Sequence, residues 1–101
     1  MEKQKRLALV LDNEDNVATL LTNGFESDII TLKGIEGKLQ IFEDIELGHK
    51  SALKHISNGE AVVKYGHRIG VATKNIQPGE WVHLHNMQSV VDPIFRKRIE
   101  P

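Results

Sequence analysis

Hydrophobic residues in this chain occur in short stretches, and most stretches are separated by glycine or by small polar residues. Short apolar or alternating stretches bounded by turn residues are typical of β-strands, whereas a helix needs a longer apolar stripe. The pattern therefore predicts a mainly β domain. The predicted strands cover residues 6–11, 17–21, 28–32, 38–42, 61–65, 69–73 and 81–85, and residues 51–56 form either a strand or a helical turn.

A short internal repeat adds detail to this prediction. Residues 56–62 and 76–82 both read Ile, two residues, Gly-Glu, one residue, Val. Gly59 and Gly79 would reverse the chain in each copy, because glycine adopts the positive φ that such turns require. We expect two pseudo-symmetric turns that send their strands into a shared core. The predicted core residues are Val17, Ile56, Val62, Ile69, Ile76 and Val82.

The end of the chain has a different pattern. Asp92 and Pro93 are a typical helix start, and the cations of residues 96–98 suit a helix C-terminus. The sequence thus predicts one domain over residues 1–91, followed by residues 92–101 as a short C-terminal helix that is a tail or the start of a linker. Its apolar side chains need a surface to cover them, so we also expect a homo-oligomer.

Composition narrows the function classes. The chain has 101 residues, no cysteine and a formal net charge of -1, which indicates one small domain without disulfides or thiolate chemistry. Near-neutral charge argues against nucleic-acid and membrane partners, and no apolar run is long enough to span a bilayer. A cytoplasmic protein is the simplest interpretation. A chain of this size rarely encloses a deep active site, so we expect a binding module or a site shared with a partner.

His83 and His85 are the most informative candidates for chemistry. If residues 81–85 form a strand, both imidazoles project from one face while Leu84 points inward. Two imidazoles could hold part of a metal site, act as acid and base, or bind an anion. An exposed polar strand face would show the same alternation.

Other candidates are weaker when taken alone. His49 and Lys50 follow Gly48 and could present two donors to a carboxylate, or they could form an exposed corner. Tyr65 ends a predicted strand, where a half-buried ring with a solvated hydroxyl is common. Asn16 ends the polar segment that begins at Asp12, which predicts a turn, and its amide could face a ligand.

Taken in order, several motifs of this chain resemble the SAF domain of the altronate and galactarate dehydratase family. They are Asp15-Asn16-Val17-Ala18, Gly48-His49-Lys50-Ser51-Ala52-Leu53, Val63-Lys64-Tyr65-Gly66, and Val82-His83-Leu84-His85-Asn86, together with the two Ile-x-x-Gly-Glu turns. The resemblance implies a β-clip fold, similar to antifreeze-like domains. It also implies a large catalytic dehydratase domain or subunit as partner, a sugar acid as substrate, and a divalent metal, Fe(II), shared with that partner.

The resemblance also implies roles for individual residues. His83 and His85 would be metal ligands or acid/base residues, His49 and Lys50 would bind a carboxylate, and Asn16, Tyr65 and Asn86 would orient the substrate. The expected function is the small subunit or N-terminal module of a sugar-acid dehydratase that eliminates water and is inactive alone. Two alternatives remain open, since sulfolactate sulfo-lyase small subunits share these motifs: a subunit of that kind, or a non-catalytic module that binds sugar acids or proteins.

Overall fold

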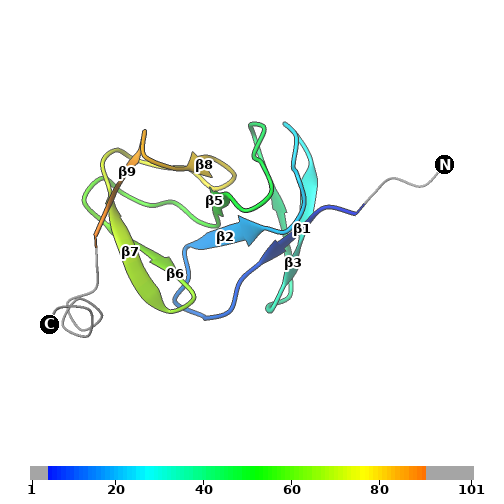
Figure 1. Cartoon of the computed structure of the whole chain (residues 1–101), viewed down its shortest axis with the longest axis horizontal. Helices are drawn as coiled ribbons and strands as arrows, with labels where there is room; N and C mark the ends of the chain where they lie inside the picture. The colour runs from blue at the N-terminus through cyan, green and yellow to red at the C-terminus, as the bar shows by residue number, and fades with distance from the viewer. Residues whose placement is uncertain (1–4, 91–101) are drawn as a thin grey trace, which may run out of the picture.

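All regular structure in residues 5–90 is β-strand (Figure 1). The computed structural model describes residues 5–90, and that range contains no helix, so the mainly β prediction is confirmed. The predicted C-terminal helix and tail lie outside the described residues. No helix within residues 5–90 has the length and apolar character needed to cross a membrane. The strands are β1 (Leu7–Leu9), β2 (Val17–Leu20), β3 (Ile29–Lys33), β4 (Lys38–Gln40), β5 (Lys50–Ala52), β6 (Ala61–Lys64), β7 (His67–Ala72), β8 (Trp81–Val82) and β9 (Met87–Ser89).

The strands form two sheets. A six-stranded sheet has the order β4-β3-β1-β2-β5-β8, and a three-stranded sheet has the order β6-β7-β9. Only β1 and β3 pair in parallel among the pairs of the described chain. The larger sheet curls so that the segment after β4 returns to β8: the Phe42 amide donates to the Gly79 carbonyl at 3.1 Å, and the Trp81 amide donates to Glu43 Oε2 at 2.9 Å.

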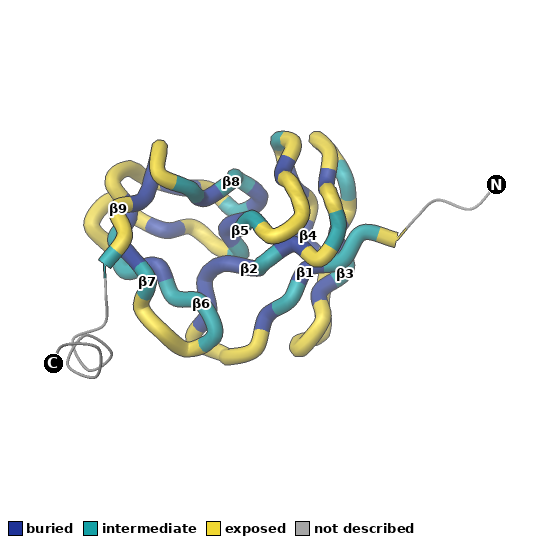
Figure 2. The backbone as a smooth tube through the Cα atoms, viewed as in Figure 1, coloured by how far each residue is buried: buried dark blue, intermediate teal, exposed yellow. Residues whose placement is uncertain are grey.

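Strand β2 separates two hydrophobic cores. Successive strand residues face opposite sides of a sheet, so Ala18 joins one core while Val17 joins the other. The first core lies within the curl of the six-stranded sheet, and the second lies between β2, β5, β8 and the three-stranded sheet (Figure 2). Of the predicted core residues, Val17, Ile56, Val62, Ile76 and Val82 are buried and Ile69 is partly buried.

The predicted pseudo-symmetry of the repeat is confirmed. Ile56 and Ile76 exchange both backbone hydrogen bonds, at 2.9 and 2.8 Å, in an isolated antiparallel bridge. A second bridge of the same kind joins Gly24 and Ile45, at 2.8 and 2.9 Å. The sequence pattern showed only the first pair, because Gly24 replaces the isoleucine and the loop it precedes lacks the Gly-Glu signature.

The predicted strand over residues 81–85 is wrong beyond Val82. Residues 83–86 form a turn, and the chain then enters β9, which the pattern did not predict. Leu84 does not point inward: its side chain is 69% exposed at the tip of this turn. The ambiguous segment 51–56 contributes a strand, since β5 covers residues 50–52.

Candidate functional site

Three imidazoles gather around Trp81, the single tryptophan of the chain. The His83 ring stacks on the indole with 5.2 Å between centroids and 7° between planes, and the His85 ring is tilted at 5.0 Å. The His49 ring meets the indole edge-on at 5.6 Å and lies 5.3 Å from the His83 ring. We call these four side chains the imidazole cluster.

Backbone register explains why residues so far apart in sequence meet here. Lys50 pairs with Val82 and Ser51 pairs with Trp81 across β5 and β8, which puts His49 opposite His83. His49 and Trp81 leave the same face of the sheet, because residues two apart on a strand share a face. The cluster therefore depends on strand pairing and is not encoded by local spacing alone.

His49 has a defined hydrogen-bonding state within the cluster. The Trp81 indole Nε1 donates to His49 Nδ1 at 3.3 Å, so Nδ1 acts as an acceptor. In a neutral imidazole the other nitrogen, Nε2, then carries the proton and is a donor. A donor of this kind suits a carboxylate or hydroxyl oxygen on a ligand.

The turn over residues 83–86 is held by Asn86. Its buried side chain accepts a hydrogen bond from the His83 amide at 2.9 Å and donates one to the Trp81 carbonyl at 2.8 Å. His83 and His85 are therefore placed by a turn and not by strand alternation. They still share a neighbourhood, because both rings contact the same indole.

Lys50 lies apart from the imidazole cluster. It pairs with Val82 and Thr19, and its side chain leaves the face of β5 opposite to that of His49. Burial, and then the nearby charge of Lys64, lower the pKa of Lys50. The predicted pair of carboxylate donors at residues 49 and 50 is thus divided between two faces of one strand.

The other predicted orienting residues also lie away from the imidazole cluster. Asn16 is buried, and its amide bonds the backbone of β6, donating to the Ala61 carbonyl and accepting from the Val63 amide at 2.8 Å each. Tyr65 sits in the β6–β7 turn with a φ of 53°, and Lys64 Nζ lies 4.9 Å from its ring centroid.

The described residues contribute at most part of a metal centre. Nowhere in residues 5–90 do three or more His, Asp or Glu side chains come together as metal ligands. His83 and His85 could offer two imidazole nitrogens, which leaves the remaining positions of a coordination sphere to other ligands.

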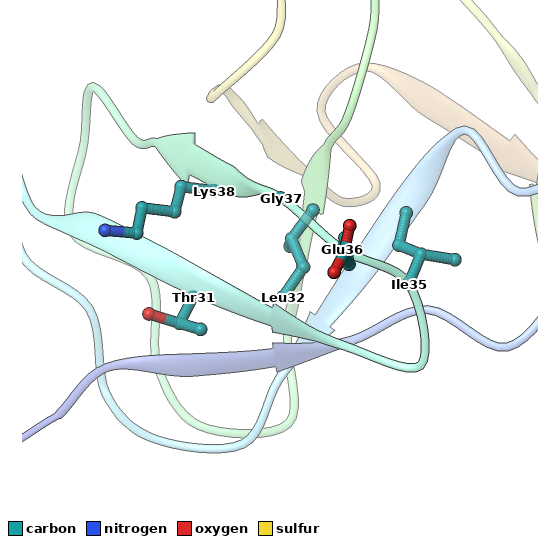
Figure 3. Close-up of a pocket in the computed structure, with 6 residues that line it drawn as sticks. All are labelled: Thr31, Leu32, Ile35, Glu36, Gly37 and Lys38. Atoms are coloured by element: carbon teal, nitrogen blue, oxygen red, sulfur yellow. The ribbon is translucent and has the colours of Figure 1, made fainter.

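A separate hollow lies at the β3–β4 hairpin (Figure 3). Its lining residues are Thr31, Leu32, Ile35, Glu36, Gly37 and Lys38. It contains no imidazole, and a single Glu and a single Lys are its charged groups. The imidazole cluster is the better candidate for chemistry, because it brings several groups able to transfer protons into contact.

Sequence reasoning missed two contributors to this site. Trp81 is the centre of the cluster, and Glu43 holds the Trp81 amide from the segment after β4. The signal for Trp81 was present, since the only tryptophan lies two residues before His83. Nothing local to Glu43 indicated that the curl of the sheet would bring it to β8.

Residues 5–90 thus form a small all-β module with paired pseudo-symmetric loops and a cluster of imidazoles. Residues 6–90 match the family described as altronate/galactarate dehydratase SAF domain, and the chain belongs to that family. The family resemblance that the motifs indicated is thereby confirmed.

Relatives of two kinds align with the chain. It is 32% identical over 84 residues to altronate dehydratase of Bacillus subtilis and 34% identical over 87 residues to altronate dehydratase of Escherichia coli, covering 83% and 86% of this chain. It spans only 16% and 17% of those two proteins, about a sixth of their length. It is also 28% identical over 86 residues to the (2R)-sulfolactate sulfo-lyase subunit alpha of Chromohalobacter salexigens, covering 80% of this chain and 92% of that subunit.

Proposed function

We propose that this chain is the SAF module or small subunit of a sugar-acid dehydratase, and that its imidazole cluster forms part of a site shared with a large catalytic partner. The observation that carries the proposal is the contact of His49, His83 and His85 with Trp81 in a chain of this family. The much greater length of the altronate dehydratases supports a large partner.

The proposed chemistry is β-elimination of water from a hydroxy acid. A base takes the proton from Cα, the carbon next to the carboxylate. The C–O bond of the hydroxyl on the next carbon, Cβ, then breaks. An acid gives a proton to this departing oxygen, which leaves as water. The enol that remains becomes a 2-keto acid by proton transfer. Imidazoles suit both proton transfers near neutral pH. We assign these transfers to His83 and His85.

His49 would bind the substrate carboxylate. Its Nε2 carries the proton because Nδ1 accepts from Trp81, so the ring offers a hydrogen bond to an anionic oxygen. Asn86 acts as a positioning residue, since both of its bonds fix the turn that carries His83 and His85.

A divalent metal, Fe(II) in the expected case, belongs to this proposal as a shared cofactor. If His83 and His85 held this ion instead of transferring protons, they would be the ligands that this chain contributes, and the partner would supply the other ligands together with the acid and the base. When bound, such an ion stabilises negative charge that develops on the carboxylate during elimination.

A second candidate is supported by the alignment with a sulfo-lyase subunit. The chain aligns with 92% of the Chromohalobacter salexigens sulfo-lyase subunit alpha, so the alternative is a small subunit of an enzyme of that kind. The two candidate reactions differ in the group that is eliminated, water or sulfite. The partner and the substrate would determine which group leaves. A non-catalytic sugar-acid binding or protein-interaction module is the third reading.

Reconstitution tests these readings. The tagged full-length chain is used to capture its large partner from the native host, and the separated proteins are then recombined with altronate, galactarate or (2R)-sulfolactate. We expect 2-keto acid from a sugar acid only when both proteins are present. Release of sulfite from sulfolactate would favour the second candidate.

Variants locate the chemistry within this chain. The double variant His83→Ala/His85→Ala should lose most of the reconstituted activity, while His55→Ala, an exposed histidine in another loop, should retain it. Full activity of the large protein alone, or of the double variant in complex, would overturn the proposed role and leave an interaction module.

A further inference from the structure

Exposed apolar side chains surround the imidazole cluster. Leu84, Leu47 and Phe42 are 69%, 59% and 57% exposed, and with Leu11 they are the four most exposed large hydrophobic residues in residues 5–90. A single exposed apolar side chain is ordinary, but several around one site mark a surface that contacts another molecule. The placement of three of these four side chains beside the cluster therefore indicates a contact surface.

Leu84 and Leu47 each lie next to histidines of the cluster. Leu84 is at the tip of the turn over residues 83–86, between the two histidines whose rings contact the indole. Leu47 is two residues before His49, whose ring contacts both the indole and the His83 ring. In Figure 1 the segment that leads into β5 and the turn between β8 and β9 both rise above β2, on the same side of the molecule. The two leucines thus reach the neighbourhood of the cluster on different loops.

Phe42 reaches the same region from the segment after β4. Its amide donates to the Gly79 carbonyl at 3.1 Å, and a Cβ added at Gly79 would come within 2.7 Å of its ring. Gly79 is two residues before Trp81, and Glu43, the neighbour of Phe42, accepts a hydrogen bond from the Trp81 amide at 2.9 Å. Phe42 therefore lies against the turn that leads into β8 and the centre of the cluster.

Hydrogen bonds hold the backbone around all three apolar residues. The Leu47 amide donates to Asn23 Oδ1 at 2.8 Å, and the Phe42 amide is bonded to the next loop. The buried Asn86 side chain closes the turn that carries Leu84. Side chains on an ordered backbone lose less freedom on binding, so more of their contact energy is retained as affinity. Exposed apolar groups on such loops are suited to anchor a partner.

The segment that contains Phe42 and Leu47 is also acidic. Glu43, Asp44 and Glu46 lie between the two apolar residues, and the chain has no lysine or arginine between residues 38 and 50. The ion pair found in residues 5–90 joins Arg6 to Asp28, so none of the three carboxylates has a cation within 4.0 Å there. Complementary charge attracts a partner to such a surface. A partner that fits here has positive charge beside its apolar contacts.

A second copy of this chain fits the surface poorly. In a two-fold contact the same patch meets itself, so the carboxylates of residues 43–46 would face their own counterparts. Like charges that face each other oppose association. A protein of different sequence can place cations there, and it can also complete the cluster, because the described residues bring together no three metal ligands.

We infer that Phe42, Leu47 and Leu84 are the apolar anchors through which this chain docks on its large catalytic partner. The matching surface of the partner has apolar pockets and carries positive charge opposite residues 43–46. The inference rests on the proposed function for the existence of that partner, and it adds the docking surface and the chemistry that fits it. Docking at this place covers the imidazole cluster.

Binding of the full chain to a defined large protein tests the inference. The probe is the purified host protein that resembles the part of altronate dehydratase which this chain does not match. We expect saturable binding in the micromolar range or tighter, measured by biolayer interferometry. Leu47→Ala and Leu84→Ala should each weaken this binding about tenfold, because a few buried anchors carry most of the binding energy of an interface.

Leu11→Ala is the matched control. Leu11 is 60% exposed, but it lies between β1 and β2, outside the segments that contact the cluster. This variant should retain the wild-type affinity, and circular dichroism of each isolated variant verifies the fold. Wild-type affinity in both Leu47→Ala and Leu84→Ala would overturn the surface, as would an equal loss in Leu11→Ala.

Charge supplies a second test that remains available if a leucine variant fails to fold. Raising NaCl from about 50 to about 500 mM should weaken wild-type binding, because salt screens attraction between exposed charges. Glu46→Gln should bind a few-fold more weakly than the wild type and respond less to salt. Glu36→Gln, an exposed glutamate in the β3–β4 hairpin, is the control and should behave as the wild type. Unchanged or stronger binding in Glu46→Gln would contradict the positive charge of the partner.

Two further outcomes separate this inference from its competitors. Self-association of the chain that Leu47→Ala and Leu84→Ala abolish would assign the surface to a second copy and overturn the inference. Binding that depends on both leucines, in a complex without dehydratase activity, would leave the docking surface standing and overturn only the dehydratase assignment. An active complex that forms equally well with both leucine variants would overturn the surface and leave the proposed function intact.

Discussion

Four loops of this protein each contain a residue with a similar positive φ. Ser27, Gly48, Gly59 and Gly79 each have a φ between 76° and 90°. Ser27 demonstrates that a side chain is tolerated at this φ. The surroundings differ, since a Cβ at Gly59 would meet nothing within 4 Å, whereas a Cβ at Gly79 would collide with the Gln40 carbonyl and the Phe42 ring.

This contrast gives a prediction at the residue scale. Gly59→Ala should lower the free energy of unfolding by about 1–2 kcal/mol, because an L residue is disfavoured at positive φ. Gly79→Ala should cost about 1–3 kcal/mol more, since backbone must also move to make space. Urea unfolding of both variants measures the difference. Equal destabilisation would contradict the close approach of β4 to the Gly79 turn.

The pKa of Lys50 makes a second prediction at this scale. Burial and the charge of Lys64 lower this pKa below its ordinary value of 10.5, while the unfolded chain keeps the ordinary value. Between the two values the unfolded chain binds more protons, so raising the pH through this window favours the folded state. Urea unfolding should be measured at pH 7 and pH 10. Between these two pH values the free energy of unfolding should gain more in the wild type than in Lys50→Gln. A smaller gain in the wild type would reverse the sign and refute the prediction.

At the scale of elements, the turn after β8 decides where the histidines lie. The buried Asn86 side chain closes this turn with two hydrogen bonds, so a four-residue segment replaces the end of a strand. The imidazoles then depend on Asn86 for their position beside Trp81.

Asn86→Ala should therefore disturb both stability and the cluster. Loss of the two bonds leaves the His83 amide and the Trp81 carbonyl without partners, which should cost about 1–3 kcal/mol. Trp81 is the only tryptophan, so its fluorescence should change in the folded variant. Asn58→Ala, at an exposed position in another loop, is the control. An unchanged emission spectrum in Asn86→Ala would show that the cluster does not need this turn.

The bridge between Ile56 and Ile76 couples two further elements. Both side chains are fully buried in one core, so each alanine variant should cost about 2–5 kcal/mol. The double variant should differ from the sum of the two by about 0.5–3 kcal/mol, because neighbouring substitutions share one cavity. Ile30 belongs to the other core, and its combination with Ile56→Ala should be additive. Additive costs in the Ile56/Ile76 pair would contradict their direct coupling.

The whole molecule leaves apolar side chains and a strand edge uncovered. Within residues 5–90, the exposed large hydrophobic residues are Leu11, Leu21, Phe25, Ile29, Ile35, Phe42, Leu47 and Leu84. Strand β9 is an open edge of the smaller sheet, whereas Asn16 bonds the outer edge of β6 and the segment after β4 bonds the chain at β8. Exposed apolar groups and open edges favour association with a partner or with a second copy.

We predict that the purified chain self-associates at high protein concentration. Light scattering should compare the intact chain with a chain that ends at Val90, because this end point retains β9. Association of the intact chain alone assigns the contact to residues 91–101, and association of both chains assigns it to the described surface. A monomer in both cases would contradict the prediction.

The fold class and much of the core were predictable from the sequence. Alternation over short stretches identified most strands, and the Ile-x-x-Gly-Glu repeat identified the paired turns, because both are local signals of backbone conformation and burial. The motif order also indicated the family, which the match over residues 6–90 confirmed.

The grouping of the candidate residues, in contrast, follows from contacts between strands that are distant in sequence. Strand pairing brought His49 to Trp81, and the curl of the sheet brought Glu43 there. The same pairing placed Lys50 on the opposite face from His49, beside Thr19. These outcomes depend on the register between strands that are distant in sequence. A shift of one residue in this register would move each side chain of the strand to the opposite face of the sheet. The spacing of residues along the sequence does not specify that register. The sequence pattern therefore identified the candidate residues but not their arrangement.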